Sequence, residues 1–132
     1  MIVADTNLVA YLFIPGTATD LATAVLRKDP DWVAPPLWRS EFRSVLAGYI
    51  RQDLLSPGAA VAYARDAETL LTEHEVDAAD VLRLVAASTR SAYGCEFVAL
   101  AERLGVPLVT ADRAVARDFP GVARSPEAFV AG

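Results

Sequence analysis

Short apolar runs alternate with longer segments of helical periodicity along this chain. Apolar runs of three or four residues that end at an acid or a proline are typical of buried parallel strands. The longer segments repeat apolar residues three and four positions apart, as helices with one buried face do. The pattern predicts strands at residues 1–4, 32–34, 74–76 and 107–110, and an edge strand near 122–123.

Helices are predicted between these strands, several with a recognisable start or end. Ser56-Pro57 has the form of an N-cap followed by proline at the first helical position, and Gly105 suits the end of a helix. The predicted helices span residues 6–13, 17–28, 37–51, 57–71, 77–88 and 92–104, with a short helix after residue 112 and a last turn after Ser125. This alternation predicts an α/β layered fold in which a small, mainly parallel sheet is flanked by helices.

The composition predicts one domain over residues 1–132. A length of 132 residues is close to the commonest domain size, and 54% hydrophobic residues supply enough apolar surface for a core. The single cysteine, Cys95, excludes an intrachain disulfide framework and a multi-cysteine zinc site, and suits a small buried apolar position.

Charge and hydropathy bear on location and partners. The longest stretch without a charged residue, 6–19, contains Pro15 and Gly16 and is too short and polar to span a membrane. With Asp5 where a secretory signal would be basic, we expect a soluble cytoplasmic protein. A net charge of −5 disfavours a broad non-specific nucleic-acid surface, but it is compatible with a carboxylate-rich metal site.

Two aspartates directly follow predicted strands. Asp5 ends the first strand and Asp112 follows the strand at 107–110. Ligands of parallel α/β sheets bind beyond the carboxyl ends of the strands, where both side chains are expected. Each aspartate also precedes a helix, so helix capping is the alternative interpretation. The occurrence of both at one end of the sheet favours a shared site.

Glu41 is the third acidic candidate. It lies early in the predicted helix 37–51 and borders the apolar face of that helix. A glutamate beside an apolar stripe is usually a solvated surface residue, so only its combination with Asp5 and Asp112 suggests a functional role.

Four segments in order carry a family resemblance: the opening MIVADTN, the SEF triplet at 40–42, YGCEFVALA at 93–101 and LGVPLVTADR at 104–113. With them the chain resembles the PIN domain ribonucleases, and most closely the VapC toxins of bacterial toxin–antitoxin pairs. The resemblance implies a three-layer PIN-like fold and an acidic site that binds Mg²⁺ or Mn²⁺ and cleaves RNA. It also implies a homodimer and a VapB-like antitoxin whose tail covers the acidic site.

The resemblance assigns roles to particular residues. It places the catalytic and metal-binding acids at Asp5, Glu41 and Asp112, and the supporting polar residues at Thr6, Asn7 and Thr110. The family normally has an aspartate after Tyr93, where this chain has Gly94. Glu96 is a poor substitute, because two residues further along a helix is about 200° around its axis.

The residue types agree with the metal chemistry that the resemblance implies. Acids without cysteine or histidine suit Mg²⁺ or Mn²⁺ rather than zinc. His74, the only histidine, is expected to be an ordinary surface residue, and it supports no Ser-His-Asp or Cys-His set. Four arginines near the acids could contact RNA phosphates, or else pair with nearby acids: Arg39, Arg43, Arg113 and Arg117.

The sequence is compatible with three functions. The first is a VapC-like metal-dependent endoribonuclease, impaired by Gly94. The second is a catalytically silent PIN domain that binds an antitoxin and RNA. The third, a phosphotransferase with Asp5 as nucleophile, is disfavoured because Asn7 stands where such enzymes place a second aspartate.

Overall fold

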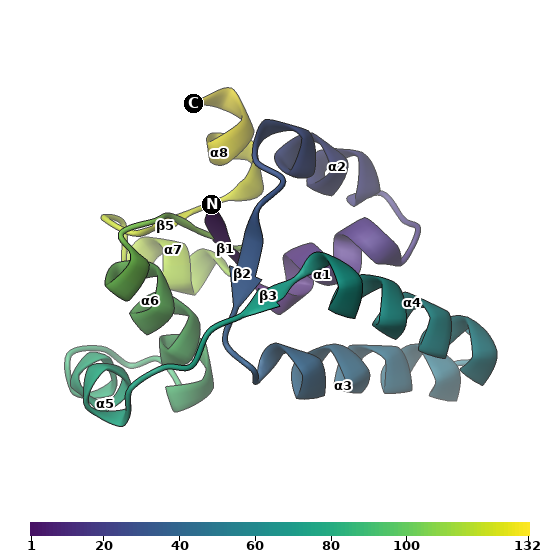
Figure 1. The fold of residues 1–132 in the computed structure, drawn as a ribbon, viewed down its shortest axis with the longest axis horizontal. Helices are drawn as coiled ribbons and strands as arrows, with labels where there is room; N and C mark the ends of the chain where they lie inside the picture. The colour runs from purple at the N-terminus through teal and green to yellow at the C-terminus, as the bar shows by residue number, and fades with distance from the viewer.

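Five strands form one sheet in the computed structural model, which describes residues 1–132 (Figure 1). The strands are β1 (Ile2–Ala4), β2 (Trp32–Ala34), β3 (Thr72–Glu73), β4 (Leu108–Val109) and β5 (Ala123–Arg124). Their spatial order is β3-β2-β1-β4-β5, and every neighbouring pair is parallel. The predicted α/β class is therefore confirmed, with a sheet that is entirely parallel.

Eight helices surround the sheet. They are α1 (Thr6–Phe13), α2 (Thr19–Lys28), α3 (Trp38–Arg51), α4 (Pro57–Leu70), α5 (Ala78–Ala86), α6 (Ala92–Leu104), α7 (Arg113–Asp118) and α8 (Pro126–Ala131). Figure 1 shows α1 to α4 on one side of the sheet and α5 to α7 on the other, so the molecule has three layers. No helix is both long and apolar enough to cross a membrane.

The sheet order creates a crevice beside its central strand. The chain first builds outward from β1 through β2 to β3, and then crosses to the opposite side of β1 to form β4 and β5. Ligands bind at such a switch point in open α/β sheets. Ala4 of β1 pairs with Val109 of β4, so the residues that follow these two strands emerge side by side.

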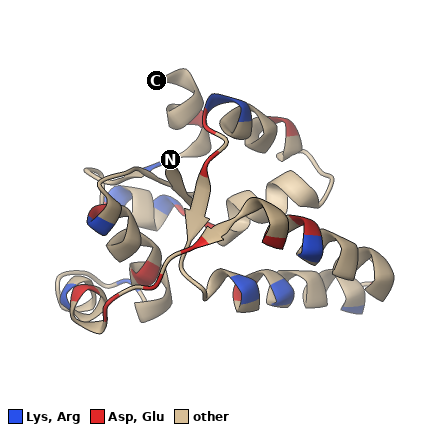
Figure 2. Ribbon diagram, viewed as in Figure 1, with Lys and Arg blue, Asp and Glu red and all other residues tan.

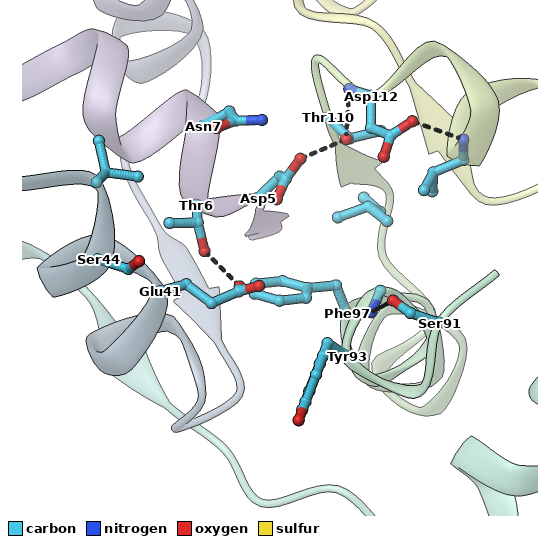
Figure 3. Close-up of a pocket in the computed structure, with 14 residues that line it drawn as sticks. Asp5, Thr6, Asn7, Glu41, Ser44, Ser91, Tyr93, Phe97, Thr110 and Asp112 are labelled. Carbon is cyan, nitrogen blue, oxygen red and sulfur yellow. Dashed lines mark hydrogen bonds between the residues drawn. The ribbon is translucent and has the colours of Figure 1, made fainter. Parts of the chain in front are cut away.

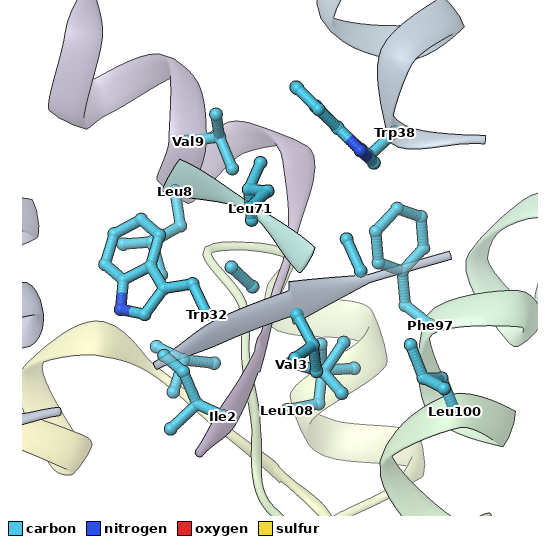
Figure 4. Packing of buried hydrophobic residues seen from close by; sticks show 14 of the residues in the cluster. Ile2, Val3, Leu8, Val9, Trp32, Trp38, Leu71, Phe97, Leu100 and Leu108 are labelled. Carbon is cyan, nitrogen blue, oxygen red and sulfur yellow. The ribbon is translucent and has the colours of Figure 1, made fainter. Parts of the chain in front are cut away.

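The core is one cluster of 30 buried apolar residues. The sheet residues Ile2, Val3 and Leu108 lie between helix side chains that include Leu8 of α1 and Leu100 of α6 (Figure 4). Short strands with no polar residue are buried on both faces in this arrangement. The predicted burial of Cys95 is confirmed.

Helix α6 has clear physical limits. Its N-cap, Ser91, accepts a hydrogen bond at its Oγ from the backbone N–H of Gly94 (3.1 Å). It ends at Gly105, whose φ of 67° is in the left-handed region that glycine tolerates best. The Ser91 cap thus fixes the first turn of α6, which lines the crevice.

Some predicted boundaries are wrong by a few residues. The third strand is Thr72–Glu73 rather than 74–76, because the pairing with β2 already begins after the buried Leu71. Helix α2 begins at Thr19 rather than at residue 17, because the Thr19 hydroxyl accepts from the backbone N–H of Gly16 and forms a turn there (3.0 Å). The last strand is shifted by one residue, to Ala123–Arg124.

Candidate active site

A pocket of about 450 Å³ opens at the carboxyl ends of β1 and β4 (Figure 3). Elements from both sides of the sheet contribute to it, including α1 and α3 on one side and α6 and α7 on the other. Its lining residues are Asp5, Thr6, Asn7, Glu41, Ser44, Val45, Ser91, Tyr93, Gly94, Phe97, Leu108, Thr110, Asp112 and Val115. The pocket thus brings together the three candidate acids, the three supporting residues and Gly94.

Asp5 is held by the neighbouring strand segment rather than by its own helix. Its backbone N–H donates to the carbonyl of Val109 (3.1 Å), which continues the sheet pairing by one residue. Asp5 occupies the N-cap position of α1, but its side chain makes no capping hydrogen bond. Instead, its Oδ2 accepts from the hydroxyl of Thr110 (2.6 Å). The hydrogen-bond partner of the Asp5 carboxylate is therefore Thr110 of the neighbouring segment and not the helix that follows it.

Asp112 does cap the helix that follows it. Its Oδ1 accepts from the backbone N–H groups of Ala114 (2.9 Å) and Val115 (3.2 Å) at the start of α7. Its own N–H donates to Oγ1 of Thr110 (3.0 Å), so one threonine links Asp112 to Asp5. Oδ2 of Asp112 makes no hydrogen bond, and the residue lines the pocket. Capping and a role in the pocket are compatible here.

Glu41 is half-buried and is oriented by a residue of α1. Its Oε1 accepts from the hydroxyl of the buried Thr6 (2.9 Å), across a separation of 35 residues (Figure 3). An ordinary helix glutamate has a solvated side chain without a partner. Glu41 differs, because its side chain is half-buried and hydrogen-bonded. Thr6 therefore holds a Glu41 oxygen at the pocket, as Thr110 holds an Asp5 oxygen.

Burial and mutual repulsion act on two of these acids. Burial raises the pKa of Asp5, and the charge of Asp112 also raises it, although the Thr110 hydroxyl and the nearby backbone N–H groups of Thr6 and Asn7 lower it. Burial likewise raises the pKa of Glu41, with contributions from the charges of Asp5 and Glu96. Without a cation, ionisation of Asp5 and of Glu41 therefore destabilises the folded state.

This electrostatic arrangement predicts a pH dependence of stability. A carboxyl whose pKa is raised in the fold binds protons more tightly there than in the unfolded chain, so its stabilisation is present at low pH and disappears as pH rises through the folded pKa. In EDTA at neutral pH, Asp5→Asn should therefore have a larger free energy of unfolding than the native chain. Urea denaturation over a pH series measures this difference.

Asp66→Asn is the matched control, because Asp66 is exposed on α4 and makes no ion pair. It should leave the free energy of unfolding at neutral pH nearly unchanged. A lower stability of Asp5→Asn at neutral pH would contradict the inferred unfavourable ionisation.

The acids surround the pocket rather than gathering tightly. No group of three or more His, Cys, Asp or Glu side chains is close enough together to hold an ion. In this side-chain arrangement the three carboxylates therefore do not form one direct ion-binding cluster, and the expectation that they share a cation directly or through water stays a prediction. Mg²⁺ keeps several of its waters in protein sites, so acids on opposite sides of a pocket can still be bridged through those waters.

Gly94 faces the pocket from the first turn of α6. A Cβ at this position would meet only Oγ of Ser91, at an ordinary contact distance of 3.5 Å. The backbone thus has room for a larger side chain beside the acids. Glu96 does not line the pocket, as its helical spacing predicted, although its charge contributes to the raised pKa of Glu41.

The four candidate RNA-binding arginines lie outside this pocket. Arg39 pairs with Glu73 and with Glu68 (3.2 Å), and Arg43 also pairs with Glu68 (3.7 Å). Arg117 pairs with Asp118 (3.3 Å), and Arg113 lines a separate groove. Figure 2 shows basic and acidic residues interspersed on the helices. Pairing with acids, the alternative interpretation, is what the structure shows for Arg39, Arg43 and Arg117.

Sequence reasoning did not single out several of the lining residues. Ser44 lies three positions after Glu41 on α3, and Phe97 lies three positions after Gly94 on α6, so helical spacing places each on the same face as its neighbour. Tyr93 and Ser91 flank the start of α6. Ser44 and Phe97 could have been predicted from the sequence, because each lies three residues after a candidate position, Glu41 or Gly94, on the same helix.

Comparison with known protein families agrees with this architecture. The family model of the PIN domain matches residues 2–120, which is most of the chain. A search of the curated proteins finds no match. PIN domains are generally metal-dependent nucleases, and a pocket of carboxylates at the carboxyl edge of a parallel sheet suits that chemistry. The fold, the position of the pocket and the family match together show that this chain belongs to the PIN domain family.

Proposed function

We propose that this chain is a VapC-like endoribonuclease that hydrolyses RNA phosphodiester bonds with the help of Mg²⁺ or Mn²⁺. The observation that supports it most is the convergence of Asp5, Glu41 and Asp112 on one pocket at the switch point of the sheet. These residues come from three separate parts of the sequence, and two of them are oriented by threonine hydroxyls.

The chemistry of the pocket fits a hard divalent cation. Its possible ligands are carboxylate, hydroxyl and amide oxygens, without a cysteine or histidine. Asp5, Glu41 and Asp112 would hold the ion. When bound, such an ion lowers the pKa of water and stabilises the negative charge that develops on the phosphate.

The residues of the chain contribute orientation and charge. The Thr110 hydroxyl donates a hydrogen bond to Asp5, and the Thr6 hydroxyl donates one to Glu41, so each carboxylate keeps a fixed direction. The cap on α7 fixes Asp112 while leaving Oδ2 without a partner. The raised pKa values of Asp5 and Glu41 reflect buried negative charge that a cation would stabilise.

Gly94 supports a second candidate, a PIN domain that binds its partners but does not cleave. The pocket contains three acids, and the position where the family has a fourth carries no side chain. Loss of one oxygen ligand weakens the hold on a cation or misorients the attacking water. We therefore propose a low rate of RNA cleavage for the native chain.

A metal titration followed by an RNA cleavage assay tests the proposal. Binding to the folded state alone raises the free energy of unfolding by about 1.4 kcal/mol when the free metal is about tenfold above its Kd. We expect Mg²⁺ and Mn²⁺ to raise the melting temperature and to support slow cleavage of RNA. A melting temperature unchanged by millimolar concentrations of both ions would contradict the metal site.

The resemblance to VapC toxins supports two further proposals, a homodimer and a VapB-like antitoxin as inhibitor. Sedimentation equilibrium of the purified chain tests the first, and a twofold mass is expected. Co-purification with the product of a neighbouring small reading frame, together with loss of RNA cleavage in that complex, tests the second.

A further inference from the structure

The pocket contains no lysine or arginine among its lining residues, although it contains three acids. An RNA backbone that enters it is therefore repelled by the protein wherever a cation does not compensate. Contacts to the bases are the remaining source of attraction from side chains. Stacking on an aromatic ring is such a contact, and it needs no charge.

Tyr93 is the one large apolar side chain that is both strongly exposed and part of this pocket. Its side chain is 63% exposed, whereas the other exposed large apolar residues, among them Leu54, Val61 and Leu82, line no part of the pocket. Its hydroxyl makes no hydrogen bond within the chain. Figure 3 shows the ring pointing out of the pocket from the start of α6, with the hydroxyl outermost.

The backbone under this ring is well anchored. Tyr93 lies between the N-cap Ser91 and the buried Cys95, so the first turn of α6 is held by a cap on one side and by the core on the other. Phe97, one turn further along, is buried in the wall of the same pocket. The adjacent Gly94 has no side chain that could cover the ring. The exposed ring thus lies at the rim of the acidic pocket on a backbone that is already ordered.

We propose that Tyr93 is a stacking platform that holds an unpaired nucleobase of the substrate next to the phosphate bound in the acidic pocket. The proposal rests on the proposed nuclease function, which places a phosphate near Asp5 and Asp112. Bases within a duplex have both faces covered, so a platform at this position selects unpaired nucleotides. Tyr93 acts by positioning the strand and takes no part in proton transfer.

Binding measured without cleavage tests this role. The probe is a short fluorescein-labelled single-stranded RNA of mixed sequence, in buffer containing Ca²⁺, with a gel to verify that the RNA stays intact. We expect Tyr93→Ala to raise Kd by about 5- to 100-fold, and Tyr93→Phe and Tyr93→Trp to bind like the native chain. Because Trp32 and Trp38 are buried, quenching of the exposed Trp in Tyr93→Trp reports stacking directly.

Leu82→Ala is the matched control, because Leu82 is 59% exposed on α5 and lies outside the pocket. It should leave Kd unchanged, and a duplex of the same sequence should bind the native chain and Tyr93→Ala equally. Equal affinity of the native chain and Tyr93→Ala for single-stranded RNA, including no measurable binding by either, would overturn the stacking role. Ring-dependent binding without metal-dependent cleavage would support it and would contradict only the nuclease proposal.

Discussion

Gly94→Asp should raise metal-dependent RNA cleavage by about 10- to 100-fold over the native chain. Position 94 lines the pocket, and an added Cβ meets only Oγ of Ser91 at an ordinary contact distance of 3.5 Å, so the backbone there accepts a side chain that can extend into the pocket. A fourth acid adds an oxygen ligand for the cation or orients the attacking water, which is worth a few kcal/mol at the transition state. The melting temperature should also rise more steeply with Mg²⁺, because metal affinity increases together with activity.

Cleavage of a labelled RNA at saturating Mg²⁺ measures this effect, with Ala92→Asp as the matched control. Ala92 is exposed in the same first turn of α6 and does not line the pocket. An aspartate there has the same favourable interaction with the helix dipole without adding a ligand. Equal cleavage rates for the native chain and Gly94→Asp would show that three acids are sufficient and that glycine is no defect.

Asp5→Asn should abolish both the metal response and the cleavage. The amide oxygen can still accept from the Thr110 hydroxyl, so the local structure is expected to be retained. The negative charge that holds a cation is lost, which should lower the cleavage rate on the order of 100-fold or more. The loss is best measured in the Gly94→Asp background, where the starting rate is higher.

The same variant should be more stable than the native chain in EDTA, since burial and the charge of Asp112 make ionised Asp5 unfavourable. A gain in stability together with a loss of activity indicates that Asp5 serves function, because replacing an acid that stabilises the fold would lower the stability. The control Asp66→Asn should change neither property. Retained metal-dependent cleavage in Asp5→Asn would contradict the assignment of Asp5 to the site.

Local sequence signals predicted most elements well. The alternation of short apolar runs with helical periodicity predicted the strands Ile2–Ala4 and Trp32–Ala34, whose bounds are close to those observed. Ser56-Pro57 and Gly105 marked helix ends correctly, because caps act through hydrogen bonds and backbone angles within a few residues. The third strand was misplaced because it contains only Thr72 and Glu73, and its pairing with β2 is what defines it.

Local sequence patterns do not predict which residues pair with the charged side chains. Nothing near Arg39 in the sequence indicates that it pairs with Glu68 and Glu73, which come from the following helix and strand. The hydrogen bond from Thr6 to Glu41 likewise joins residues 35 positions apart. Such contacts depend on how helices and strands pack, because residues of different elements can be far apart in the sequence and close in space.

The α/β class and the positions of Asp5 and Asp112 after their strands follow from the amino-acid sequence alone, because strand length, apolar runs and helix starts are local properties. The resemblance in its ordered motifs added Glu41 and the absence of an acid at Gly94. The folded chain was needed to show that β1 and β4 are neighbours, and hence that these residues share one pocket. It also placed Tyr93 at that pocket and the arginines outside it, because strand order and helix packing are set by contacts between distant segments.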